Sequence, residues 1–154
     1  MIQFSVDFRK STETSQTVFY REEDFAFDTV PAAVSTFTSI LLDDVNLEVD
    51  EIGKVIAIWG LCPHTMWKEA ILIPPAVPAG ELLVQNDLPL EQGVSIRISL
   101  AGKHLATYLD KNNGWVKIEH KCEVEMSVHI LPNVIVDLGP DREIAQLWIK
   151  PIFE

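Results

Sequence analysis

Cysteine is scarce in this chain: among its 154 residues, only Cys62 and Cys122 are cysteines. Small secreted domains that depend on disulfides carry a much denser set, so a disulfide framework is excluded as the basis of the fold. We therefore expect two reduced, buried thiols in a cytoplasmic protein. A disulfide between them is the less favoured alternative.

Long apolar runs are also missing. No stretch approaches the roughly 18 apolar residues that a membrane-spanning helix needs. The first ten residues alternate apolar Ile2, Phe4 and Val6 with polar residues, which is a strand pattern and not the unbroken apolar segment of a signal peptide. The sequence thus predicts a soluble protein that is neither exported nor bound to a membrane.

Basic residues are few: 12 Lys and Arg stand against 23 Asp and Glu, which gives a net charge of -11. Because a phosphate-binding surface needs clustered Lys and Arg, nucleic acid is excluded as a partner. Residues 1–51 hold 11 acidic and 3 basic residues, and the rest hold 12 and 9. This asymmetry predicts a recognition face for a basic protein, although a solvated acidic surface is the commoner explanation. The candidate binding residues are Glu22, Glu23, Asp24, Asp43, Asp44, Asp50 and Glu51.

Familiar catalytic motifs are absent as well. The sequence has no nucleophile elbow, phosphate-binding loop, dinucleotide fingerprint or zinc-protease helix. This lowers the expectation of an enzyme without excluding one, since catalytic triads assemble from residues distant in sequence. We expect a non-enzymatic binding domain with no catalytic residues and no cofactor, and a homo-oligomer is compatible with the sequence.

The most informative stretch that is present is residues 116–130, where apolar and polar residues alternate with period two. Successive side chains of a strand point to opposite faces, so one face is predicted to be core and the other water. At about 3.3 Å per residue the run would span roughly 50 Å, so we expect it to bend or to change partners. The sequence predicts a single domain, residues 1–154, that is mainly β (β-rich α+β): an antiparallel sandwich or barrel-like sheet of long bent strands.

A hairpin is predicted between residues 105–110 and 116–122. Asn113 and Gly114 suit a tight turn, and a two-residue loop would pair Leu109 with Ile118 and Thr107 with His120. A four-residue loop preserves the same facing. Ile118, His120 and Cys122 are then expected to point inward.

Helical periodicity occurs at residues 31–42, where Val34, Phe37 and Leu41 are spaced like one face of a helix. One helix is predicted there, although several β-branched residues lower the propensity. Further strands are predicted at residues 2–8, 18–27, 47–50, 54–59, 66–73, 82–84, 94–100, 134–138 and 144–153. Residues 18–27 have a charged middle, so a bulge or an exposed edge is expected there. Residues 54–59 are apolar on both faces, as in a central strand covered on both sides, with the helix as one cover.

A small-molecule pocket is the alternative function. Aromatic side chains that line the inside of a barrel or the end of a sandwich make apolar pockets with a few polar anchors. The pocket residues would be Trp59, Cys62, His64, Trp67 and His120, with residues 59–67 at the mouth. The competing interpretation is that tryptophans are simply large core residues.

Two residue pairs have a spacing that suits metal ligands: Cys62 with His64, and His120 with Cys122. Each pair would face one side of an extended segment, and the four groups could hold zinc if the segments were neighbours. A core histidine beside a core cysteine is more ordinary when the imidazole is hydrogen-bonded. We therefore expect no bound metal.

Overall fold

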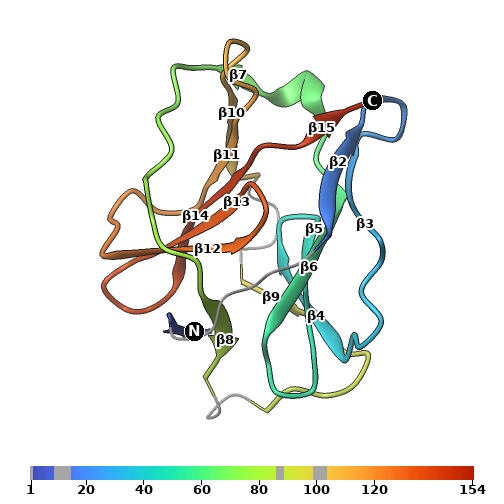
Figure 1. The fold of residues 1–154 in the computed structure, drawn as a ribbon, viewed down its shortest axis with the longest axis vertical. Coiled ribbons are helices and arrows are strands. Elements are labelled where there is room, and N and C mark those ends of the chain that lie inside the picture. Colours follow the sequence, from blue (N-terminus) through green and yellow to red (C-terminus); the bar gives the residue numbers. More distant parts are fainter. Residues whose placement is uncertain (1, 9–14, 86–88, 99–103) are drawn as a thin grey trace.

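The chain folds into a mainly β structure, seen in a computed structural model that describes residues 2–8, 15–85, 89–98 and 104–154 (Figure 1). Strands make up 49% of it, and the described residues contain no α-helix. The strands are β1 (Phe4–Asp7), β2 (Thr17–Arg21), β3 (Ala26–Val30), β4 (Thr38–Leu42), β5 (Val45–Val49), β6 (Val55–Leu61), β7 (Lys68–Glu69), β8 (Glu81–Val84), β9 (Ile96–Arg97), β10 (Ala106–Leu109), β11 (Val116–Glu119), β12 (Met126–Leu131), β13 (Val134–Leu138), β14 (Ile144–Ile149) and β15 (Ile152–Phe153). Two 3-10 helices occur, η1 (Glu22–Asp24) and η2 (His64–Met66). Among the described residues, no helix has the length and apolar character to cross a membrane.

Two large sheets pack around a shared core, which confirms the predicted mainly β, sandwich-like fold (Figure 1). One has six strands in the order β12-β13-β14-β11-β10-β7, and the other has seven in the order β15-β2-β3-β6-β5-β4-β9. Both are antiparallel inside and gain parallel strands at their edges, namely β7 on β10, β15 on β2 and β9 on β4. A small sheet of β1 and β8 lies beside them.

The core between the sheets is one continuous cluster of apolar side chains. Its fully buried members include Tyr20 and Ile58 from the seven-stranded sheet, Ile118 and Leu138 from the six-stranded sheet, and Phe4 from the small sheet. Each buried side chain of this size stabilises the fold by about 1.5–3 kcal/mol. The core thus ties all three sheets together.

A second, smaller cluster lies on the outer face of the six-stranded sheet. Residues 70–77, which we call the strap, cover this face: Leu72 packs with Ile135 and Trp148, and Ala70 and Val77 lie against them. In Figure 1 the strap belongs to the green chain on the left. One outer face of the sandwich is therefore covered by a loop.

The strap corrects the strand that was predicted at residues 66–73. Only Lys68 and Glu69 pair with another strand. Ala70 N still donates to the backbone oxygen of Leu109 at 3.0 Å. At Leu72 the backbone bonds with side chains instead: Leu72 N donates to Asp110 Oδ2 at 2.9 Å, and Asn113 Nδ2 donates to Leu72 O at 2.8 Å. The segment covers the sheet in an extended conformation. The sequence pattern alone does not distinguish such a segment from a strand that is paired within the sheet.

The long alternating run changes partners partway, as predicted. β11 pairs with β10 and β14, and β12 pairs with β13. Between them the regular ladder stops, and His120 N and Lys121 N both donate to Ala145 O. The prediction that Cys122 is buried is wrong: it lies in this break and is exposed, while His120 is half-buried.

The hairpin of β10 and β11 is confirmed, with a pairing shifted by two residues. Leu109 faces Val116 and Thr107 faces Ile118, so the loop is the four-residue segment 111–114. Asp110 Oδ1, which accepts from Asn112 N at 2.9 Å, holds this turn. A register shift of two residues leaves each side chain on the same face of the sheet, so Ile118 is buried as expected.

The helix predicted at residues 31–42 does not form. Thr38–Leu42 is strand β4 instead, between β5 and β9, and Val34 is 98% exposed. Thr38 Oγ1 donates to Val94 O at 2.7 Å, which joins β4 to the segment before β9. The β-branched residues favour the strand, and tertiary pairing overrides the helical spacing.

The strand predicted at residues 18–27 is also wrong, because the chain reverses in its middle. β2 and β3 form an antiparallel hairpin, and the charged residues form η1 at its tip. Phe25 ends η1 in a left-handed conformation with φ 53°. The acidic run is therefore a turn, neither a bulge nor an edge.

The remaining predicted strands exist, β13 with the predicted bounds and the others with altered bounds. Residues 2–8, 47–50, 54–59, 82–84 and 134–138 correspond to β1, β5, β6, β8 and β13. Residues 144–153 form two strands, β14 and β15, separated at Lys150 and Pro151. Residues 94–100 contribute only β9, and residues 99 and 100 lie outside the described part of the chain.

Candidate functional site

Strand β6 ends where three connections of the chain come together. η1 joins β2 to β3, residues 43–44 join β4 to β5, and η2 follows β6. Gly60 permits the close contact between β6 and the β4–β5 turn, because a Cβ at this position would lie 2.2 Å from the backbone oxygen of Asp44. Its φ of +129° is also rarely adopted by residues with a side chain. The glycine thus lets the β4–β5 turn lie directly against β6.

An open groove of about 540 Å³, which we call the outer groove, lies over the outer face of β6. Within it, Trp59 is 44% exposed and Leu61 is 54% exposed. Its polar lining consists of Arg21, Asp24, Asp28, Asp44, Asn46 and Arg97. The prediction that β6 is covered on both faces is therefore wrong, because the expected covering helix does not form.

Asn46 and Leu41 continue the row that Trp59 begins across the sheet. Asn46 is the cross-strand neighbour of Trp59, and Leu41 is the next one along. Asn46 is only 8% exposed, and its Oδ1 accepts a hydrogen bond from Ser39 Oγ at 3.1 Å. This amide is thus fixed beside the tryptophan ring.

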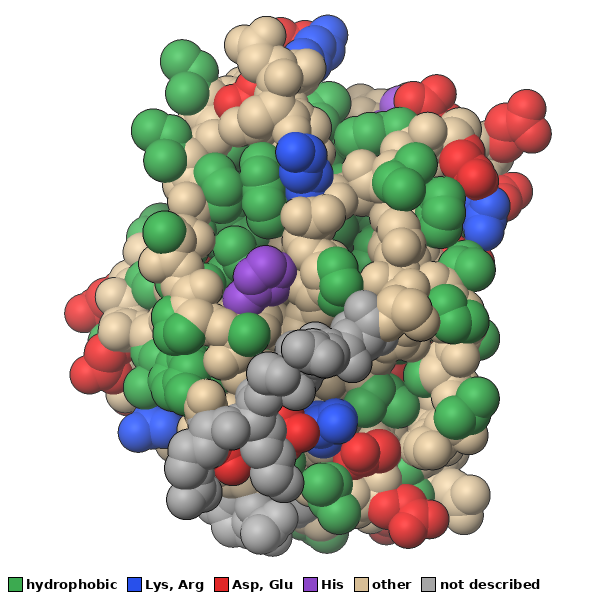
Figure 2. Space-filling model, in the orientation of Figure 1, with side chains coloured by type: hydrophobic (Ala, Val, Ile, Leu, Met, Phe, Trp, Pro, Cys, Tyr) green, Lys and Arg blue, Asp and Glu red, His purple; other side chains and the backbone are tan. Residues whose placement is uncertain are grey.

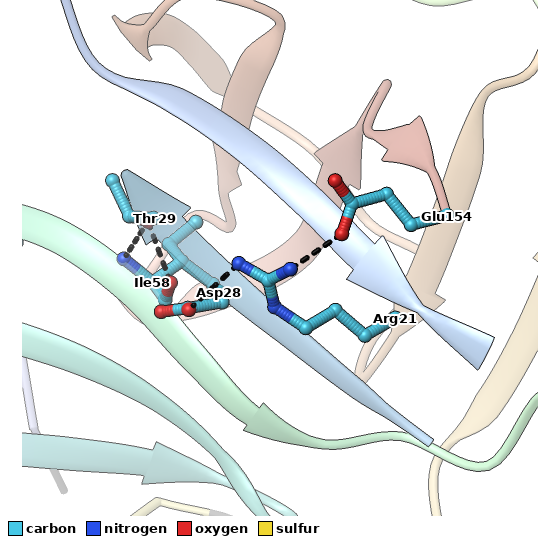
Figure 3. A network of polar contacts seen from close by, with 5 residues as sticks. All are labelled: Arg21, Asp28, Thr29, Ile58 and Glu154. Atoms are coloured by element: carbon cyan, nitrogen blue, oxygen red, sulfur yellow. Dashed lines mark hydrogen bonds and ion pairs between the residues drawn. The ribbon is translucent and has the colours of Figure 1, made fainter. Parts of the chain in front are cut away.

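On the other side of β6, a side chain takes over from the backbone ladder. Pairing between β3 and β6 covers only Ala26 with Leu61 and Phe27 with Gly60. Beyond it, Thr29 Oγ1 accepts from Ile58 N at 3.1 Å and donates to Ile58 O at 2.6 Å (Figure 3). The threonine keeps the two strands together next to Trp59.

At the edge of the outer groove, Arg21 links β2 to β3 and to the residue that follows β15. Its guanidinium contacts Asp28 at 3.4 Å on one side and Glu154 on the other (Figure 3). It also lies 5.6 Å from the centre of the Phe19 ring. Such exposed ion pairs contribute at most about 1 kcal/mol each, so their main effect here is to orient the Asp28 carboxylate.

Arg97 has a corresponding position at the far edge. Its Nη1 donates to the backbone oxygen of Asp43 at 2.7 Å, and its Nη2 lies 3.7 Å from Asp44 Oδ1. Asp43 Oδ2 accepts from Leu105 N at 2.7 Å. The two guanidinium groups thus flank the groove, and each holds an aspartate.

The seven predicted acidic residues fall into two groups. Asp24 and Asp44 both line the outer groove, next in sequence to Glu22, Glu23 and Asp43. Asp50 and Glu51 lie in the β5–β6 turn, at the opposite end of β5. Asp50 has a structural role there, since its Oδ1 accepts from Ile52 N at 3.1 Å and Lys54 N at 2.9 Å. In Figure 2 acidic side chains accordingly lie at several separate places around the visible face.

A second hollow of about 340 Å³, which we call the inner pocket, opens beside the first, between the two sheets. Cys62 and Trp67, two of the five predicted pocket residues, line it together with Met66, Leu105 and Ile118. Leu61 and Asp44 line both hollows. Trp59 belongs to the outer groove instead.

The thiol of Cys62 is not available for chemistry. Burial raises its pKa to about 11, so the group stays protonated near neutral pH. Its backbone oxygen accepts from Tyr20 Oη at 2.7 Å, and burial raises the pKa of Tyr20 to about 12. The pocket wall is therefore neutral at this point.

The two predicted histidines lie elsewhere. His64 stacks on Phe25 with ring centres 5.2 Å apart, and its Nδ1 is 3.3 Å from Tyr20 Oη. His120 Nδ1 bonds to Ile144 O at 3.1 Å and lines a separate hollow with Glu143. Neither histidine lines the inner pocket among the described residues.

The predicted metal-like pairs do not meet. Cys62 and Cys122 are both free thiols, and Cys122 donates to Glu119 Oε1 at 3.1 Å, a bond that raises the pKa of Cys122. Within the described part of the chain, no group of three or more His, Cys, Asp or Glu side chains is arranged to hold a metal ion. The four residues thus have separate environments.

Several residues of the outer groove escape sequence reasoning. Asp28 lies outside the predicted set of acidic residues, and Asn46 and Arg97 come from other strands. Cross-strand neighbours depend on pairing register, which the sequence does not state. The usable signal was Trp59 beside Gly60, a large aromatic residue at the point where a strand makes a close contact.

The sequence was also compared with known proteins. No family model matches the chain, and no relative was found among curated proteins.

Proposed function

We propose that this protein is a non-enzymatic interaction domain whose outer groove binds a basic segment of a protein partner in the cytoplasm. The observation that carries the proposal is the exposed Trp59 in the middle of a sheet, flanked by fixed carboxylate and amide groups. The apolar surface of a tryptophan in that position is removed from water only when another molecule covers it.

Charge around the outer groove favours a basic partner. The described residues that line it and the adjoining hollow at η1 include six carboxylates and two guanidinium groups. The carboxylates are Glu22, Glu23, Asp24, Asp28, Asp44 and Glu154. An excess of one sign at the rim raises the association rate of an oppositely charged partner, most strongly at low salt.

The face of Trp59 suits a lysine or arginine side chain. A cation over an indole ring gains about 0.5–2 kcal/mol, and nearby carboxylates add to the attraction. Leu61, which lines the groove and is 54% exposed, supplies further apolar contact. Tryptophan and arginine are enriched among the residues that dominate binding energy at protein interfaces.

Several side-chain environments support binding over catalysis. The described hydrogen bonds of His64, His120 and His129 lead to a tyrosine hydroxyl or to the backbone, not to a serine or cysteine nucleophile. Cys62 is held as a neutral thiol. Two free thiols also fit the proposed reducing compartment.

The proposal is tested by isolating the partner with the native protein and measuring association kinetics with variants. Trp59→Ala should weaken binding by roughly 30-fold, the effect of a residue worth about 2 kcal/mol. Asp24→Lys should slow association several-fold at low salt, and the effect should shrink at high salt.

Matched controls come from elsewhere on the surface. Glu51→Lys makes the same change of charge at the opposite end of β5, and Ile71→Ala removes an apolar side chain that is 87% exposed on the strap. Neither should alter binding. Normal binding by Trp59→Ala, or equal slowing by Glu51→Lys and Asp24→Lys, would contradict the proposal.

A further inference from the structure

The inner pocket is separate from the outer groove and has different chemistry. It lies between the sheets, and Leu61 and Asp44 divide it from the groove. Its wall is mostly apolar, formed by side chains such as Leu42, Val45 and Ile118. The proposed contact of a basic segment with Trp59 does not use this space.

One polar atom in the wall has no partner. Trp67 Nε1 is buried and is the one such side-chain nitrogen or oxygen in the described part of the chain that makes no hydrogen bond. The thiol of Cys62, a weak acceptor, lies near enough for the indole to affect its pKa. Leaving a buried donor unpaired costs about 1–3 kcal/mol, which a bound acceptor would offset.

We propose that the inner pocket binds a small, uncharged, mainly apolar molecule that carries one hydrogen-bond acceptor. The apolar part contacts Leu42, Val45 and Ile118. The acceptor takes the Trp67 N–H, which has to turn toward the pocket because it is buried in the free protein. The site shares Leu61 and Asp44 with the outer groove but does not use Trp59, so it does not depend on the proposed protein-binding function.

The size of the pocket limits the ligand. A dry cavity of about 150 Å³ is known to accept benzene, so the inner pocket, with a volume of about 340 Å³, suits a molecule of about two fused rings. This volume also lies near the lower end of the range of about 300–1,000 Å³ that is typical of ligand pockets. Larger ligands would need movement of η2.

Charge at the pocket rim favours a neutral ligand over an anionic one. Asp43 and Asp44 line it, and Asp43 Oδ2 already accepts from Leu105 N at 2.7 Å. Lys68 and His104 also line the pocket, and both are exposed. A neutral molecule avoids both the repulsion and the cost of burying an unpaired charge.

The test uses prodan, a neutral naphthalene ketone dye whose emission shifts to the blue in apolar surroundings. The native protein should bind prodan saturably with one dye per chain. Cys62→Phe fills the pocket from its wall, and Met66→Trp fills it from a residue that is 62% exposed and cannot disturb the core. Both should weaken binding at least about tenfold, because they remove the space for the dye.

Two controls separate this site from other surfaces. Cys122→Phe makes the same substitution at the exposed cysteine and should leave prodan binding unchanged. Trp59→Ala removes the tryptophan of the outer groove and should also leave it unchanged. Failure of this proposal would therefore be distinguishable from failure of the protein-binding proposal.

The acceptor is tested by competition between two neutral naphthalenes. Acetylnaphthalene has a carbonyl oxygen for the Trp67 N–H, and ethylnaphthalene has none. Acetylnaphthalene should displace prodan at roughly threefold to tenfold lower concentration, the value of one net hydrogen bond. Equal competition would overturn the role of Trp67. Absence of a saturable blue shift, or binding that survives both Cys62→Phe and Met66→Trp, would overturn the site itself.

Discussion

The two sheets each carry a tryptophan on the outer face of a central strand, and the two residues have opposite environments. Trp148 on β14 is 6% exposed, whereas Trp59 on β6 is 44% exposed. The strap covers Trp148 through Leu72, while the outer groove leaves Trp59 open. The same residue type is thus a structural element in one sheet and an accessible surface in the other.

Polar contacts strengthen this contrast. Trp148 Nε1 donates to Asp137 Oδ2 at 2.8 Å, and Ser127 Oγ donates to Asp137 Oδ1 at 2.6 Å. The ammonium of Lys117 lies 5.3 Å from the ring centre of Trp148. Every part of this side chain is therefore already engaged. Burial and hydrogen bonding together, and not the residue type, separate a core tryptophan from a candidate binding residue.

Truncating each of the two tryptophans should give the largest difference in the free energy of unfolding. Trp148→Ala leaves a cavity under the strap and an unpaired Asp137 oxygen, so it should lower the free energy of unfolding by about 3–5 kcal/mol. Trp59→Ala should change it by less than about 1 kcal/mol, because this side chain belongs to neither apolar core cluster. Urea unfolding of both variants measures the difference, and similar losses would show that the outer groove is structural.

The next largest difference in stability is expected between substitutions at two neighbouring positions of the strap. Leu72→Ala removes a side chain that is 4% exposed and should cost about 2 kcal/mol, near the low end for buried leucines, since a loop can relax. The control Ile71→Ala alters a side chain that is 87% exposed and should cost less than about 0.5 kcal/mol. Thermal unfolding of the two variants tests this. Equal shifts of their melting temperatures would mean that the strap does not depend on its contact with Trp148.

Acid should loosen the strap. Hydrogen bonds from Leu72 N and Asn112 N hold the pKa of Asp110 below its ordinary value of 3.8. A carboxyl with a depressed folded-state pKa stabilises fully above its unfolded-state pKa and loses this effect as the pH falls through the folded-state value. Asp110→Asn should be less stable than the native protein at neutral pH, and the two should converge below about pH 4. Denaturation at a series of pH values tests this, and parallel curves would contradict it.

Metal removal should have the smallest effect on either region. Cys62, His64, His120 and Cys122 have separate environments, so a chelator should leave the melting temperature unchanged. Elemental analysis provides the independent measurement. One zinc per chain, lost in His120→Ala, would overturn the expectation.

Strand existence could be predicted from the sequence because side-chain alternation depends on local geometry. Residues 134–138 became β13 with those bounds, and Ile118 is buried on the expected face. The failures occurred where tertiary contacts decide. At residues 31–42, pairing with β5 and β9 overrode a helical spacing, and at Glu22–Asp24 the chain turned where charge indicated an edge.

The candidate site was predictable in part for the same reason. Trp59, Cys62 and Trp67 were singled out as aromatic or soft groups close together in sequence, and they line the two adjacent hollows. His120 and the pair Asp50 and Glu51 were assigned to those sites by sequence alone, but register and turns place them elsewhere.

Gly60 also has a consequence for how the chain selects its fold. Strand β6 is apolar along both faces, so its side-chain pattern alone would tolerate sliding along β5 in steps of two residues. Such a slide would place Ile58 or Cys62 opposite Val45, where Gly60 now stands, and a Cβ at the present position would meet the Asp44 oxygen at 2.2 Å. The missing side chain therefore acts as a register lock, which excludes competing alignments by steric conflict rather than by favouring the native one.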